Sequence, residues 1–301
     1  MIFRSPLTII TLLLSANIFA APNIVVSIKP IHSIVSSLTQ GITEPKLLLK
    51  TNQSAHHTHL KPSQLSLLSH ADLAIFIHPT FEGRLKKVLA NLDANKKLII
   101  GIVKNIHLIH NEEHEKGEKH EEHKEHNEHQ EKVNYHLWLD VNNMQIFAKT
   151  LIERLIKIDP DNQSNYTTNL EKLNRNLDKL KQDINQKLSV YKPKVLSSYS
   201  NTFDYFTNAN QLKKSINITS YHDERLSIFK ILEAKKIMKN TQTKCLLTTI
   251  EVPKKRINSL TEGLNINSAS IDIIGFNIQQ GSGHYFKLMH NITNKIVQCL
   301  R

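Results

Sequence analysis

The chain of 301 residues contains only 2 cysteines, Cys245 and Cys299. So few thiols exclude a disulfide-dense scaffold and a zinc site made of four cysteines. The sequence also has no HExxH metalloprotease motif, no nucleophile elbow and no glycine-rich phosphate loop. An HxxEH pattern occurs at 110–114, but it is expected by chance in a tract rich in His and Glu. We therefore expect a protein that is not an enzyme.

Long apolar runs are scarce. One short run, at 7–14, follows Arg4 and precedes a small residue, Ala20. A bilayer core needs roughly 20 apolar residues in a helix, so this run is too short to span a membrane. The pattern predicts a cleaved signal peptide at 1–20 and an exported chain in an oxidising compartment. No cysteine follows the signal to support a lipid anchor.

Acidic residues are fewer than basic ones, 27 against 39, which gives a net charge of +12. Such a balance suggests nucleic acid or an anionic surface as partner. Export excludes a nucleic-acid role. Because the segment 112–132 holds nine Glu and four Lys, the rest of the chain is more basic still, and without an obvious cluster.

Apolar segments alternate with amphipathic ones in two parts of the chain. In the first part, we expect strands at 23–28, 46–49, 73–77 and 98–103, with helices at 31–39, 62–70 and 81–89. In the second part, we expect strands at 195–199, 245–252 and 269–274, with helices at 226–238, 254–264 and 285–299. Apolar strands separated by helices predict parallel sheets covered on both faces.

Two helices are expected between these parts. The first covers 141–158 and is capped by Asp140. The second has about 28 residues, because apolar side chains recur at spacings of three and four from Tyr166 to Leu188, before Pro193. The predicted fold is therefore α/β, with two domains joined by one long helix. We place the N-terminal domain at 21–158, the connecting helix at 159–192 and the C-terminal domain at 193–301.

Histidine is abundant, with 17 residues, and eight of them lie between His107 and His136. The stretch from about 107 to 133 has few apolar residues, so it cannot form a packed core and is expected to be disordered. Imidazoles bind Zn²⁺, and nearby carboxylates add oxygen donors. We interpret the segment as a metal-collecting loop rather than a solvated linker. Its candidate ligands are His110, His114, His120, His123, His126 and His129.

Several motifs of the chain resemble those of known metal-binding proteins. The SIKP sequence at 27–30, the SAHHTHLKPS sequence at 54–63 and the HLWL sequence at 136–139, beside a His-rich insert, resemble the zinc-binding ZnuA family. These are cluster A-I solute-binding proteins of ABC importers. The resemblance covers nearly the whole chain after residue 20. It implies two pseudo-symmetric parallel-sheet domains, a periplasmic location and a monomer. It also implies Zn²⁺ as the transported ion and a membrane permease with a cytoplasmic ATPase as partners.

The same resemblance implies the site residues. His56 and His136 match two ligand positions, and Asp272, in the IDIIG sequence at 271–275, matches a third. Cys245 and Cys299 match the positions of a disulfide, which would stabilise by about 4 kcal/mol in the chain-entropy model.

The chain departs from the family at one ligand position. Ser200 stands where the family has its third histidine, and serine is a poor zinc ligand. Water or another histidine is the expected substitute. The candidates are His32, His59, His78 and His222.

Two alternative functions stay open. A manganese or iron importer would favour carboxylate ligands such as Asp272, because hard cations prefer oxygen. A surface metal buffer or adhesin would bind metal without a permease.

Overall fold

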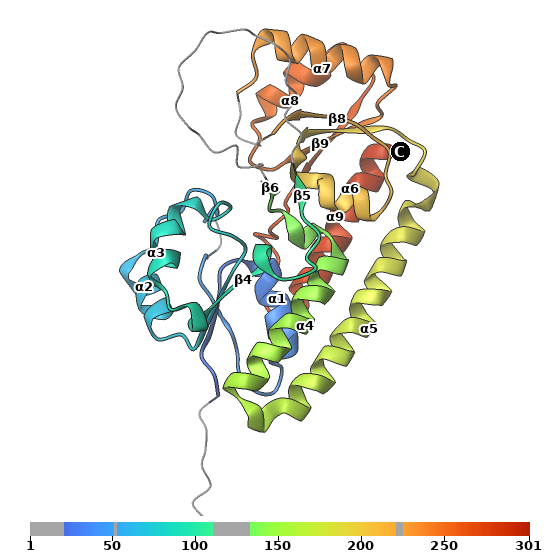
Figure 1. Ribbon diagram of the computed structural model, residues 1–301. Helices are drawn as coiled ribbons and strands as arrows, with labels where there is room; N and C mark the ends of the chain where they lie inside the picture. Colours follow the sequence, from blue (N-terminus) through green and yellow to red (C-terminus); the bar gives the residue numbers. More distant parts are fainter. Residues whose placement is uncertain (1–20, 51–52, 111–132, 221–224) are drawn as a thin grey trace, which may run out of the picture.

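The computed structural model describes residues 21–50, 53–110, 133–220 and 225–301. These residues form two α/β lobes joined by helices (Figure 1). The N-terminal sheet contains β1 (Ile24–Val26), β2 (Lys46–Leu47), β3 (Leu73–Phe76) and β4 (Lys97–Ile99), in the order β2-β1-β3-β4. All neighbouring strands are parallel, as the apolar alternation predicted.

The second lobe repeats this topology. Its sheet contains β7 (Leu196–Ser200), β8 (Lys214–Thr219), β9 (Cys245–Thr249) and β10 (Asn267–Ile271), in the order β10-β9-β7-β8. In each sheet the first strand of the chain pairs with the second and the third, and all pairs are parallel. The two lobes are therefore pseudo-symmetric, which confirms the predicted fold class.

Helices cover both sheets. Those of the N-terminal lobe are α1 (Lys29–Leu38), α2 (Pro62–Ser69) and α3 (Lys86–Asn91). Those of the C-terminal lobe are α6 (Asp204–Ala209), α7 (Ile228–Asn240), α8 (Lys254–Thr261) and α9 (His284–Leu300). Helix α4 (Val141–Ile158) follows the N-terminal sheet in the chain and packs against α5 and α1. Its N-cap Asp140 accepts a hydrogen bond from the Asn142 amide at 2.8 Å.

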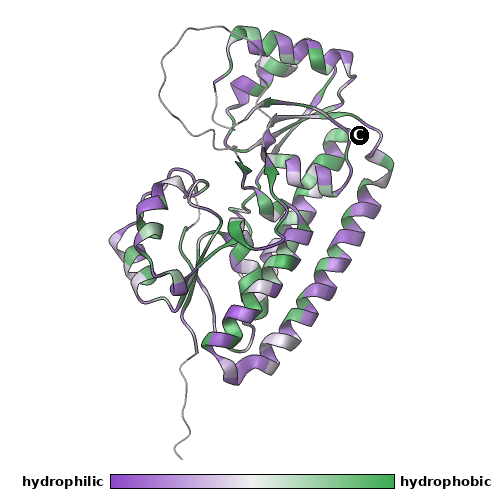
Figure 2. Cartoon of the chain, in the orientation of Figure 1, coloured by the Kyte–Doolittle hydropathy of each residue, from purple (hydrophilic) through white to green (hydrophobic). Residues whose placement is uncertain are grey.

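The long connecting helix is α5 (Gln163–Leu188), with 26 residues and a length of about 39 Å. Its buried side chains form the predicted stripe, namely Tyr166, Leu173, Leu177, Leu180, Ile184 and Leu188. They pack against α1, α4 and α9, while much of the remaining surface of the helix is hydrophilic (Figure 2). The helix therefore runs along both lobes and ties them together.

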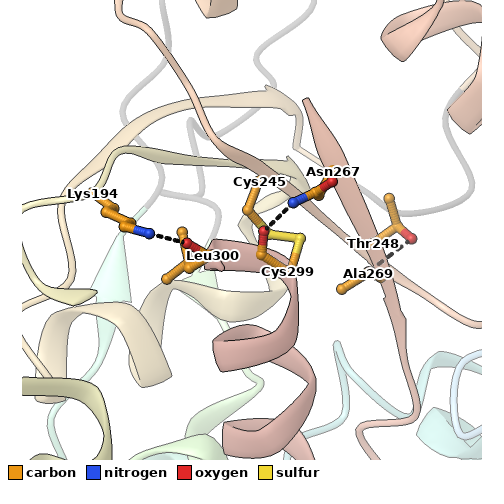
Figure 3. Close-up of a disulfide and its surroundings, with 7 residues drawn as sticks. All are labelled: Lys194, Cys245, Thr248, Asn267, Ala269, Cys299 and Leu300. Carbon is orange, nitrogen blue, oxygen red and sulfur yellow. Dashed lines mark hydrogen bonds between the residues drawn. A yellow bond between two sulfur atoms is a disulfide. The ribbon is translucent and has the colours of Figure 1, made fainter. Parts of the chain in front are cut away.

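A disulfide joins Cys245, the first residue of β9, to Cys299 in α9 (Figure 3). Around it, Asn267 donates a hydrogen bond to the Cys299 carbonyl at 2.9 Å, and Lys194 donates one to the Leu300 carbonyl at 2.6 Å. The last helix is thus fastened to the central part of the C-terminal sheet, with the pairing that the family resemblance implied.

Some elements differ from the prediction. Residues 100–102 form a 3-10 turn rather than the end of a strand. Strand β8 and the short helix α6 were not predicted. Among the described helices, none is long and apolar enough to cross a membrane.

Candidate metal centre

The carboxyl ends of the two sheets face one pocket. From the N-terminal lobe, its lining includes Ile28 after β1, residues 53–56 after β2, and Phe81 after β3. From the C-terminal lobe, it includes residues 249–251 at the end of β9 and 271–274 at the end of β10. Open α/β sheets bind ligands at the carboxyl ends of their strands. The topology therefore places a binding pocket between the lobes.

His56 stands on the N-terminal wall of this pocket and is half-buried. The loop before α2 that carries it is held by Gln64. The Gln64 side chain accepts a hydrogen bond from the Lys61 amide at 2.9 Å and donates one to the Gln53 side chain at 3.0 Å. Gln53 also accepts one from the Lys50 amide at 2.8 Å. The loop thus has a defined path at the point where His56 enters the pocket.

His136 lies beside His56, and the ring centroids are 5.9 Å apart. Its Nδ1 is 2.8 Å from Oδ1 of Asn134, a side-chain acceptor. Because the amide oxygen requires a proton on Nδ1, the neutral ring carries no proton on Nε2. This is the tautomer that a metal-binding imidazole needs, and such orienting partners are typical of metal ligands.

Phe81 packs against both imidazoles. Its ring centroid is 4.4 Å from that of His56 and 5.5 Å from that of His136. Trp138 adds a further contact, 5.3 Å from Phe81 and 5.4 Å from His136. These rings hold the two imidazoles against each other and limit the access of water.

Asp272 stands on the opposite wall, immediately after β10. Its Oδ1 accepts hydrogen bonds from the amides of Ile274 (3.0 Å) and Gly275 (2.7 Å), and its Oδ2 accepts one from Phe276 (2.7 Å). A carboxylate offers about four lone-pair positions, so one position on Oδ2 can still bind a cation.

The N-terminal lobe holds the loop that follows Asp272. The Lys29 ammonium group donates hydrogen bonds to the carbonyls of Phe276 (2.8 Å), Ile278 (3.2 Å) and Gly275 (3.4 Å). Burial lowers the pKa of Lys29, while the nearby Asp272 carboxylate raises it. Trp138 donates to the Ile273 carbonyl at 2.9 Å. The loop is therefore anchored across the lobe boundary.

His284 supports the same loop from α9. Its Nε2 is 2.9 Å from the Ile274 carbonyl, and burial lowers the pKa of the ring. Gly275 has φ +76°, and a Cβ there would lie 2.6 Å from the ring of His284. Glycine is therefore required at this turn, for both its backbone conformation and its lack of a side chain.

The other predicted ligands lie elsewhere. His32 is 1% exposed, its Nε2 is 2.8 Å from the Pro45 carbonyl and its Nδ1 is 3.2 Å from the Ser36 hydroxyl. His78 stacks on Tyr135, and its Nδ1 accepts a hydrogen bond from the Thr80 amide. Both rings therefore have local structural partners in this arrangement.

Ser200, at the end of β7, is buried, and its hydroxyl is 2.9 Å from that of Thr202. Ser200, the exposed His59 and the buried His136 all lie outside the pocket lining, but only His136 packs beside the lining residue His56 as a ring neighbour on a different element. Among the described residues, no three His, Cys, Asp or Glu side chains are close enough together to hold a metal. His222 lies outside the described residues.

The proposed collecting loop begins and ends beside His136. Its flanks pair as two short antiparallel strands, β5 (Ile109–His110) and β6 (Val133–Asn134). Asn134 in β6 is the partner of His136. His110 is exposed. The ligands predicted at His114, His120, His123, His126 and His129 lie outside the described residues.

A family model for the periplasmic zinc-uptake complex component A, ZnuA, matches residues 24–299. The chain belongs to the ZnuA family. ZnuA proteins are periplasmic solute-binding proteins that bind divalent metals and work with the permease and ATPase of an ABC transporter. They are transport proteins rather than enzymes.

Relatives of this ZnuA-family chain cover nearly its whole length. The high-affinity zinc uptake system protein ZnuA of Brucella abortus (strain 2308) is 29% identical over 304 residues, which cover 92% of this chain and 91% of that protein. The protein of the same name from Haemophilus ducreyi is 28% identical over 305 residues, with 97% and 98% covered.

Solved structures share the fold of the ZnuA family. A crystal structure of ZnuA has a TM-score of 0.75 at 18% identity and covers 93% of this chain and 100% of that one. FpvC of Pseudomonas aeruginosa in complex with Mn²⁺ also has a TM-score of 0.75, at 16% identity, with 93% and 98% covered. FpvC is also solved in complex with Ni²⁺, so neighbours of one fold carry different metals.

Sequence reasoning missed several residues of this centre. Phe81, Asn134 and Glu251 were not singled out, although Phe81 touches both imidazoles and Glu251 lines the pocket. Glu251 fell inside the predicted strand 245–252, near its end, whereas the observed strand β9 stops at Thr249. That position near a strand end was the available signal, because strand ends of parallel sheets meet at one edge.

Proposed function

We propose that the protein captures Zn²⁺ in the periplasm and delivers it to the permease of an ABC importer, whose cytoplasmic ATPase drives import. The main support is the pair of imidazoles, His56 and His136, whose ring centroids are 5.9 Å apart. His56 lines a pocket whose opposite wall carries Asp272, and His136 lies against His56 outside the lining. Neutral imidazole and carboxylate are the ligand types of non-thiolate zinc sites.

The collecting loop supplies this site. Zinc bound weakly by the His-rich segment passes to His56 and His136, because β5 and β6 fix both ends of the segment beside Asn134. The loaded protein then docks on the permease. Binding involves no covalent chemistry, so no side chain has a catalytic role. We further propose that residues 1–20 are removed on export and that the protein acts as a monomer.

The zinc site is tested by replacing its imidazoles. His56→Ala, His136→Ala and the double variant should weaken the tightest bound Zn²⁺ by more than the roughly 10–100-fold expected for the loss of an outer-shell partner. Competition with a chromophoric chelator measures this affinity. His70→Ala, which changes an exposed histidine away from the pocket, is the matched control and should bind normally. Unchanged tight binding in the double variant would refute the site.

The loop is tested separately by deleting residues 112–131. We expect fewer weakly bound equivalents and slower capture, with the cleft affinity within a few-fold of the original. A large loss of cleft affinity would contradict the shuttle role.

Delivery is tested with the permease reconstituted in lipid nanodiscs. Binding of the protein to the permease that depends on zinc would support a role in transport. Tight zinc binding without any association would instead favour the surface metal buffer.

A further inference from the structure

A second carboxylate lies on the C-terminal wall of the pocket. Strands β9 and β10 are parallel, and Thr249 pairs with Ile271 at their carboxyl ends. The Ile250 amide continues this pairing with a hydrogen bond to the Ile271 carbonyl at 3.2 Å. The next residues on the two strands, Glu251 and Asp272, therefore leave the same edge of the sheet, and both line the pocket together with His56.

A buried hydroxyl lines this pocket as well. Thr249 is 2% exposed, and its Oγ1 has no hydrogen-bond partner in the part of the chain that the structure describes. A buried hydroxyl without a partner costs about 1–3 kcal/mol. A water carried in with an ion would supply the missing partner if the walls of the pocket rearrange around it, so Thr249 is compatible with a polar occupant.

The cavity suits a small ion. Its volume is about 30 Å³, which exceeds the roughly 10–15 Å³ that one water molecule needs but is far below the size of an organic ligand. A bare cation with one bound water fits this space.

The charge balance calls for a fourth protein ligand. Two neutral imidazoles and the Asp272 carboxylate leave a divalent cation with one uncompensated positive charge. Ser200 does not supply the balance, because its hydroxyl is neutral and lies 2.9 Å from that of Thr202. Glu251 is exposed in this arrangement, and its carboxylate would bring the net charge of the occupied site to zero, which matters once closed lobes exclude water.

We propose that Glu251 is the fourth protein ligand of the transported metal, replacing the missing imidazole from the neighbouring strand end. This rests on the proposed function. The ligands stand on opposite walls, so the lobes close onto the ion as it binds. The resulting site has two nitrogen and two oxygen ligands. Carboxylates suit hard cations such as Mn²⁺ better than imidazoles do, so the cargo is a divalent first-row metal with a reduced preference for zinc.

The test compares Glu251→Gln and Glu251→His in the full-length protein after signal removal. Affinities for Zn²⁺ and Mn²⁺ alone are measured by chelator competition, and the visible absorption of bound Co²⁺ reports the ligand set. Glu251→Gln should lower the affinity for Zn²⁺ at least tenfold, lower the affinity for Mn²⁺ by a larger factor, and change the Co²⁺ spectrum. Glu251→His should restore the affinity for Zn²⁺ but not the affinity for Mn²⁺. Glu262→Gln, at an exposed glutamate after α8, is the matched control and should change nothing.

The outcomes separate this inference from the proposed function. If Glu251→Gln leaves both affinities and the Co²⁺ spectrum unchanged while His56→Ala abolishes tight binding, Glu251 is not a ligand and the zinc site stands. If neither variant changes binding, the proposed function fails as well.

Discussion

Glu82 is the least expected single residue of the N-terminal lobe. Its side chain is fully buried, and Oε2 accepts a hydrogen bond from the Ile77 amide at 3.1 Å. Burial raises its pKa from the ordinary 4.5 to about 7, against the opposing effect of its hydrogen bonds. Between these two pH values the folded protein holds a proton that the unfolded chain releases.

The free energy of unfolding should therefore fall as the pH rises from 4.5 to 7, by about 3 kcal/mol for this group. Glu82→Gln stays neutral and should remove this dependence, which makes the variant more stable than the parent at pH 8. Urea denaturation at pH 5 and pH 8 measures both effects, with Glu262→Gln as an exposed control. Equal pH dependence in parent and Glu82→Gln would contradict the assignment.

Asn134 is a second residue whose role can be isolated. Asn134→Ala removes the acceptor that fixes the His136 tautomer, so zinc affinity should fall roughly 10–100-fold. Asn134→Asp retains an acceptor oxygen, so its zinc affinity should fall less than that of Asn134→Ala. Chelator competition distinguishes the two variants, and equal affinity in parent and Asn134→Ala would show that the tautomer is set by something else.

At the scale of elements, the loop after β10 depends on α1 for its position. Lys29 at the start of α1 satisfies three carbonyls of that loop, at Gly275, Phe276 and Ile278. Ser33, one turn further, donates to the Ser282 carbonyl at 2.9 Å and accepts from the Tyr285 amide at 3.0 Å. One helix of the N-terminal lobe thus anchors both ends of a C-terminal segment.

Lys29→Met should loosen this segment, because the carbonyls lose their donor while the helix remains intact. We expect faster amide hydrogen exchange at 274–278 and unchanged exchange in α5. Lys29→Arg keeps donors at the site and should preserve more of the protection. Parent-like exchange at 274–278 in Lys29→Met would show that the ammonium group does not hold the loop.

The elements differ in how well the sequence predicts them. The long helix was predictable because its stripe from Tyr166 to Leu188 repeats with helical period over many turns. Strand β8 was missed although Ile216 and Ile218 alternate with polar residues. It lies at the sheet edge, where all of its side chains except Thr219 are only partly buried, so it lacks the continuous apolar run of the inner strands. His56 and His136 were identified through family motifs rather than through periodicity. Contacts such as Lys29 with Phe276 join residues 247 positions apart, and no local pattern reveals them.

The whole molecule has two hydrophobic cores of unequal size among its described residues. The larger one runs through both lobes and includes side chains of α1, α4, α5 and α9. The smaller one fills the space between the outer face of the C-terminal sheet and α7 and α8. It consists of Tyr199, Ala234, Met238, Leu246, Val252, Ile257 and Leu260. Leu246 and Leu247 point to different cores because successive side chains of β9 face opposite sides of the sheet.

This division means that the protein need not open as one cooperative unit. The layer of α7 and α8 can detach through sub-global unfolding while the larger core, fastened by the disulfide, stays closed. Amides of α7 and α8 should exchange faster than those of α5 and α9 in mass-spectrometric hydrogen exchange, and one common rate would contradict this.

Val252 of the smaller core directly follows Glu251, so opening the layer releases one wall of the pocket between the lobes. A bound ion should therefore slow exchange in helices that it does not touch.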